Sequence, residues 1–107
     1  MDDQQFRLRS DEALNDLYNA LVAAGDEHDF EADLGGALTV EFSDPPAKFV
    51  VSPNSPVKQI WVSAQMKSFK LDWNEGRGAF VLEETGQTLK EVVAAAVSRQ
   101  ISADVTL

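Results

Sequence analysis

The chain has 107 residues, contains no cysteine and carries a formal net charge of -9. Its length suits one domain, residues 1–107, with a single hydrophobic core. The lack of cysteine excludes disulfides, thiolate metal sites, thiol nucleophiles and cysteine-held iron–sulfur clusters within this chain, and the negative charge disfavours binding to nucleic acids or anionic membranes.

No segment of the sequence has the pattern of a membrane span or a signal peptide. The apolar runs fall short of the roughly 20 residues that a spanning helix needs. The first residues, MDDQQF, lack the basic and apolar regions of a signal peptide. We therefore expect a cytoplasmic protein that does not insert into membranes. We also expect a monomer.

Acidic residues are concentrated in the first third of the chain. Residues 1–33 carry ten carboxylates against two arginines, whereas residues 34–107 hold eight acidic and seven basic side chains. A field of one sign attracts cations or a basic protein surface, so we expect partners of that kind. The ten are Asp2, Asp3, Asp11, Glu12, Asp16, Asp26, Glu27, Asp29, Glu31 and Asp33.

The first predicted element is a helix over residues 6–24. Its apolar residues recur at i, i+3, i+4, i+7 and i+8, the spacing of one buried stripe, and Gly25 is a natural stop. On this helix Glu12, Asp16 and Asn19 share a solvent face. The stripe consists of Leu14, Leu17, Tyr18, Leu21 and Val22.

Three strands are predicted next, over residues 29–34, 38–43 and 48–51. In the first, Asp29, Glu31 and Asp33 alternate with apolar residues, which is the period of a half-buried strand with an acidic outer edge. A glycine pair at 35–36 indicates a hairpin, and turn residues at 44–46 and 52–56 separate the later strands.

The acidic edge could bind hard cations. Alternate strand residues lie about 6.6–7 Å apart, which is too wide for one tight cage but suits weak, mostly hydrated binding of iron or manganese(II) by one or two carboxylates. His28 could add an imidazole ligand. The alternative is that the charge run is only a solvated face and that His28 is an ordinary surface histidine.

The stretch VKQIWVSA, residues 57–64, is predicted to be the fourth strand. Its β-branched Ile60 and Val62 are the better core candidates, so Gln59, Trp61 and Ser63 should lie on the open face of the sheet. Tryptophan is enriched at binding hot spots. The alternative is that Trp61 merely covers the sheet, packed over neighbours such as Lys70.

Two further strands and a second helix complete the chain. Strands are predicted over 68–74 and 79–82, and a helix begins at the capping box of Thr88 and Glu91. Helix, about six antiparallel strands and helix make an α+β two-layer sandwich, with both helices on one sheet face. The stripe of the second helix is Leu89, Val92, Val93, Ala96, Val97 and Ile101.

The chain resembles the frataxin family, called CyaY in bacteria. The resemblance covers roughly residues 5–100 and is carried by GGALTV, SPNSPVKQIWVSA, KLDW and TGQTLKEVVAAAV, most specifically by KQIWVSA followed by the DW pair. It implies the frataxin sandwich and a role in iron–sulfur cluster assembly through contact with the cysteine desulfurase and scaffold protein. It also implies weak, surface-bound ferrous or ferric iron on an acidic ridge.

Residue by residue, the resemblance assigns Trp61 and Gln59 to partner contact, with Ser63 and Lys70 beside them. Lys70 stands where the family has arginine, and Ser52 where many eukaryotic members have asparagine. The family's acidic cluster late in the first helix is replaced by Tyr18, Asn19, Val22 and Ala23. The expected metal ligands are therefore Asp11, Glu12, Asp16, Asp26, Glu27, Asp29, Glu31 and Asp33.

The leading hypothesis is a binding protein rather than an enzyme, acting as an iron-dependent regulator or iron donor in a bacterial cytoplasm. A mature mitochondrial chain without its transit peptide is the alternative location. No phosphate loop, nucleophile with a base or paired metal motif occurs in the sequence. The alternative functions are a ferroxidase or iron-storage protein and an iron-independent acidic interaction module.

Overall fold

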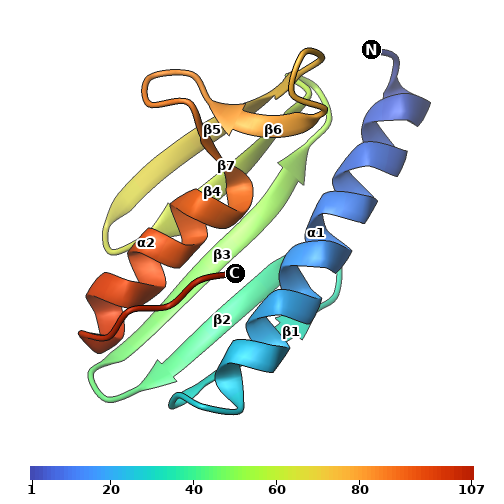
Figure 1. Ribbon diagram of the computed structural model, residues 1–107. Coiled ribbons are helices and arrows are strands. Elements are labelled where there is room, and N and C mark those ends of the chain that lie inside the picture. Colours follow the sequence, from blue (N-terminus) through green and yellow to red (C-terminus); the bar gives the residue numbers. More distant parts are fainter.

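A seven-stranded antiparallel sheet forms one layer of the molecule, and two helices cover one of its faces (Figure 1). The computed structural model describes residues 1–107. The strands follow one another in chain order across the sheet. The elements are α1 (Asp3–Gly25), β1 (Phe30–Leu34), β2 (Leu38–Ser43), β3 (Pro46–Asn54), β4 (Gln59–Ala64), β5 (Lys67–Asn74), β6 (Ala79–Leu82), β7 (Gln87–Thr88) and α2 (Leu89–Ile101). This confirms the predicted α+β sandwich.

Helix α1 begins three residues earlier than predicted, because Asp2 and Gln5 form a capping box. The Asp2 carboxylate accepts from the Gln5 amide at 2.8 Å, and the Gln5 side chain accepts from the Asp2 amide at 3.3 Å. The buried face accordingly begins at Phe6. The prediction that Val22 belongs to the buried stripe was wrong, since its side chain is 43% exposed.

The end of α1 depends on Gly25, as predicted. A Cβ atom at this position would lie 3.0 Å from the Phe30 carbonyl oxygen, which is closer than side chains ordinarily approach backbone. Glycine therefore lets β1 begin directly beside the helix end, and Asp26, Glu27, His28 and Asp29 form the short connection.

The hydrophobic core lies between the helices and the covered face of the sheet. Leu17, Leu21, Val40, Ile60 and Leu71 are fully inaccessible to solvent. After α2 the chain turns back and its end lies between the helices (Figure 1). There Val105 is buried, and its backbone exchanges hydrogen bonds with the Ser98 hydroxyl.

The sheet differs from the prediction in its number of strands and in several strand bounds; β4, for example, begins at Gln59 rather than at residue 57. The sheet has seven strands rather than about six, because β7 adds a two-residue strand beside β6. Strand β3 reaches Asn54, beyond the predicted end at Val51, although Pro53 lies in it. Val51 has the last β2 partner, so Pro53 removes no ladder bond on that side.

Helix α2 begins at the predicted capping box of Thr88 and Glu91. The Thr88 amide donates to Glu91 at 2.9 Å, and the Thr88 hydroxyl accepts from the Glu91 amide at 3.3 Å. Two hydrogen bonds lower the pKa of Glu91: the larger effect comes from the Thr88 backbone and the smaller from the Thr88 side chain.

Neither helix combines the length and apolar character needed to cross a bilayer.

Candidate functional site

The open face of the sheet presents Trp61, as the alternation of β4 predicts. Ile60 and Val62 on the covered face are at most 1% exposed, whereas Trp61 is 37% exposed. Ser63 is exposed on the same side as Trp61, and Gln59 is half-buried there. The predicted division of β4 into a core face and an open face is therefore confirmed.

The indole of Trp61 is held by its neighbours on β4 and β5. Its Nε1 donates to Gln59 Oε1 at 2.9 Å, and Gln59 Nε2 donates to Asp72 Oδ1 at 3.1 Å. The Lys70 ammonium lies 4.9 Å from the centre of the indole ring. We call Gln59, Trp61, Lys70 and Asp72 the indole block.

A shallow hollow of about 180 Å³ adjoins the indole block. Its lining combines the Trp61 indole and the Lys70 side chain with three serines and with the apolar residues Val50, Val62 and Phe69. Ser63, predicted as a contact residue, is one of these serines. Ser52, Ser68 and Val50 also line the hollow and face the open side of the sheet.

The sequence did not identify Asp72 as a member of this site. The structure shows that Asp72 faces Gln59 directly across the β4–β5 pairing, just as Lys70 faces Trp61. A prediction of that pairing register would have been enough to find the contact.

The predicted metal ligands are all exposed but do not form one site. No group of three or more Asp, Glu or His side chains comes together in a metal-binding arrangement. Asp26, Asp29 and Glu31 line one hollow of about 480 Å³ between the end of α1 and β1, together with His28. We call these four residues the acidic hollow. Glu27 lies instead beside the C-terminal segment.

The sheet extends the acidic region in a way that the sequence did not indicate. Glu31 on β1 lies directly opposite Glu41 on β2, which in turn lies opposite Lys48 on β3. Glu41 is exposed. Like charges directly opposite each other repel. Lys48 offsets part of the charge of Glu41, but the pair still adds negative charge near the β1 edge, where Asp33 also lies.

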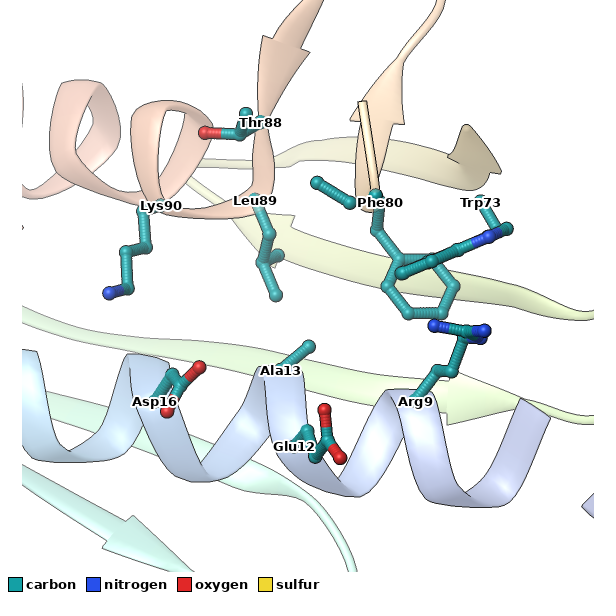
Figure 2. A pocket seen from close by; sticks show the side chains of 11 residues that line it. Arg9, Glu12, Ala13, Asp16, Trp73, Phe80, Thr88, Leu89 and Lys90 are labelled. Atoms are coloured by element: carbon teal, nitrogen blue, oxygen red, sulfur yellow. The ribbon is translucent and has the colours of Figure 1, made fainter. Parts of the chain in front are cut away.

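Two other predicted ligands, Glu12 and Asp16, lie in a separate groove of about 280 Å³ between α1 and the start of α2. Figure 2 shows their carboxylates on the α1 side of this groove, with Lys90 opposite and Arg9 at one end. These two positive side chains reduce the negative potential of the groove, although no ion pair joins them to the carboxylates. Asp11 lines neither this groove nor the acidic hollow.

The floor of the groove contains the second tryptophan. Trp73 packs edge-on against Phe80 with ring centres 5.2 Å apart, and the Arg9 guanidinium lies 4.4 Å from the Trp73 ring (Figure 2). The Trp73 Nε1 atom is buried without a hydrogen-bond partner. Trp73 thus packs on the covered side of the sheet, in contrast to Trp61.

Comparisons with known proteins agree with this architecture and extend it. A protein of Dechloromonas aromatica named iron–sulfur cluster assembly protein CyaY is 38% identical over 69% of this chain and 70% of its own length. One of the same name from Ralstonia nicotianae is 30% identical over 98% of this chain and 93% of its own.

Among solved structures, a frataxin from Psychromonas ingrahamii superposes with a TM-score of 0.78 over 99% of this chain and 97% of its own, at 23% identity, which supports the fold. The family model described as a frataxin-like domain matches residues 1–103. The resemblance noted in the sequence is thus confirmed, and the chain belongs to the frataxin-like family.

Proposed function

We propose that this protein takes part in iron–sulfur cluster assembly by docking on the cysteine desulfurase and scaffold complex through the indole block. The names of relatives that align with nearly the whole chain support the pathway. The observation that carries the docking surface is the 37% exposure of Trp61 on a sheet face that no helix covers.

The chemistry of the indole block suits protein recognition. Trp61 offers a large apolar surface, and a hollow lined by serine hydroxyls adjoins it. An exposed aromatic anchor with polar neighbours is the usual make-up of a binding hot spot. Binding is therefore the function that this geometry supports best.

We propose further that the protein carries Fe²⁺ or Fe³⁺ weakly as cargo on the acidic hollow. The donor set fits hard cations, because Asp26, Asp29 and Glu31 supply carboxylate oxygens and His28 an imidazole. The absence of any three-ligand cluster argues for loose binding with low selectivity. The other carboxylates of the first 33 residues add long-range attraction.

Desulfurase turnover in the presence of scaffold, with and without this protein and iron, tests the proposal. Wild-type protein should change the rate, and Trp61→Arg should abolish the change. Leu8→Arg is the matched control, since Leu8 is also an exposed apolar residue, at 59%, but lies on α1. A wild-type effect that persists in Trp61→Arg would contradict docking through Trp61.

A second candidate function is an iron-independent acidic interaction module, and the lack of a metal-binding cluster favours it. Calorimetry that shows no saturable heat with iron, alongside intact partner binding, would support this candidate. The same lack of converging ligands disfavours a ferroxidase, which needs several carboxylates around one centre. Oxygen consumption on adding Fe²⁺, compared with protein-free buffer, measures that activity.

A further inference from the structure

The indole block is built by the pairing of β4 with β5. Gln59 lies opposite Asp72, and Trp61 lies opposite Lys70, two residues along each strand. Because alternate residues share a sheet face, the four side chains form a compact square on the open side. Each member can therefore constrain the next.

The hydrogen-bonding capacities of these groups allow one arrangement of the Gln59 amide. An indole Nε1–H only donates, so Gln59 must present its oxygen to Trp61. The amide nitrogen then points away from Trp61, and the ionised Asp72 carboxylate, which only accepts, receives it at 3.1 Å. Asp72 thus selects the orientation of Gln59 that the indole needs.

Lys70 restrains the indole independently of this chain of hydrogen bonds. Its ammonium lies 4.9 Å from the ring centre, within the range of a cation–π contact. The Trp61 indole is thus held in two ways, by the hydrogen bond from its Nε1 to Gln59 and by the Lys70 ammonium over its ring. Holding a side chain in its bound geometry lowers the entropy lost when a partner binds.

We propose that Asp72 is a positioning residue of the docking surface, which acts through Gln59 to hold the Trp61 indole in the orientation that a partner meets. Asp72 does not itself have to touch the partner. The effect of Asp72 on partner affinity rests on the proposed function, whereas the hydrogen-bond chain can be tested in the isolated protein.

The test compares Asp72→Ala with Asp72→Asn. Alanine removes the acceptor for Gln59 Nε2, whereas asparagine keeps an acceptor oxygen at that position. The first measurement is the NMR signal and hydrogen-exchange rate of the Trp61 indole N–H. The Trp73 indole in the same spectrum is an internal reference, because it lies outside this chain of contacts. Circular dichroism and thermal unfolding verify that each variant is folded.

The second measurement is the affinity for the desulfurase and scaffold complex. Asp72→Ala should weaken binding about 2- to 10-fold, the effect expected from freeing one large side chain, and Asp72→Asn should restore most of it. Glu41→Ala is the matched control, because it removes one exposed carboxylate from the same sheet face at β2. If Asp72→Ala does not fold, Gln59→Leu breaks the same chain.

The expected result is a shifted, faster-exchanging Trp61 indole signal in Asp72→Ala, with wild-type behaviour in Asp72→Asn and Glu41→Ala. An unchanged indole signal in Asp72→Ala would overturn the proposal. An equal loss of partner affinity in Asp72→Ala and Asp72→Asn would also overturn it, because that result would mean that the negative charge of Asp72 contacts the partner directly. If Trp61→Arg leaves partner binding intact, the proposed function fails, while the indole signal still decides whether Asp72 orients Trp61.

Discussion

The indole block and the acidic hollow differ in how far their side chains are ordered before any partner arrives. In the indole block, Trp61 is fixed by a hydrogen bond from its nitrogen and by the Lys70 ammonium. In the acidic hollow, Asp26, Asp29 and Glu31 have no side-chain hydrogen bond or ion pair, and no three ligands come together. One region is pre-organised and the other is dispersed.

This difference teaches what kind of binding each region can support. A pre-organised aromatic anchor favours a defined protein contact, since less conformational entropy is lost on binding. Dispersed, solvated carboxylates favour weak and exchangeable contacts with cations or with a basic surface. The two regions therefore match the two proposed tasks, docking and cargo holding, and the predictions below test that separation.

The largest expected effect compares the two faces of β4. Ile60→Ala should lower the free energy of unfolding by about 2–5 kcal/mol, because it opens a cavity in the core. Trp61→Ala should lower it by only about 1 kcal/mol, as for a partly exposed residue. Urea denaturation measures both. A loss in Trp61→Ala as large as that in Ile60→Ala would show that Trp61 serves the fold rather than a partner.

The next effect concerns iron. The triple variant Asp26→Asn, Asp29→Asn, Glu31→Gln should lose most of the signal broadening that anaerobic Fe²⁺ causes at residues 26–33 in NMR spectra. The control Glu12→Gln, Asp16→Asn should keep it, because those carboxylates share their groove with Arg9 and Lys90. Equal broadening in the triple variant and the wild type would remove the acidic hollow as the iron-binding region.

A smaller effect is expected on the rate of partner association. The triple variant should associate a few-fold more slowly with the desulfurase and scaffold complex at low salt, while its dissociation rate stays near that of the wild type. Raising the ionic strength should shrink the difference, because exposed charges are screened. Stopped-flow measurements at two salt concentrations test this, and a changed dissociation rate would indicate direct contact instead.

The smallest effect concerns the ion pair that ties the start of α1 to the turn before β4. Lys58 Nζ lies 2.7 Å from Asp3 Oδ1. Lys58 lowers the pKa of Asp3 below 3.8, chiefly through its hydrogen bond and secondly through its positive charge. The pair therefore stabilises the fold above pH 3.8, and this contribution is lost as the pH falls through the lowered pKa.

Lys58→Met should accordingly reduce the melting temperature slightly at pH 7, and the difference from the wild type should vanish in acid. Because both groups lie at the surface, the effect should be small. Lys67→Met serves as the control, since Lys67 is exposed and has no ion pair. A difference that persists in acid would mean that the lysine side chain acts through packing instead of charge.

The sequence predicted those features that depend on a repeating pattern. The spacing of Leu14, Leu17 and Leu21 identified the buried face of α1, and the alternation of Ile60 and Val62 identified the two faces of β4. Strand β7 was missed because two residues are too few to show a period. Val22 was misplaced because the buried face of α1 is narrower than its apolar pattern.

The contact between Gln59 and Asp72 was not predictable because it depends on the register of the β4–β5 hairpin. Gln65 and Met66 form the turn, with φ of 52° and 63°. Two-residue turns of this kind usually carry Asn-Gly or Asp-Gly, and those pairs make such a turn recognisable in a sequence. This chain has Gln-Met instead, so the turn gave no signal. Lys70 was named as a neighbour of Trp61, but no pattern in the sequence indicated that Asp72 would lie opposite Gln59.

The affinity of the desulfurase and scaffold complex for two variants tests the division between the two regions most directly. Trp61→Ala should bind about 30-fold or more weakly than the wild type, as a hot-spot residue does. The triple variant of the acidic hollow should lose only a few-fold. Near-normal binding of Trp61→Ala together with a large loss in the triple variant would contradict the account.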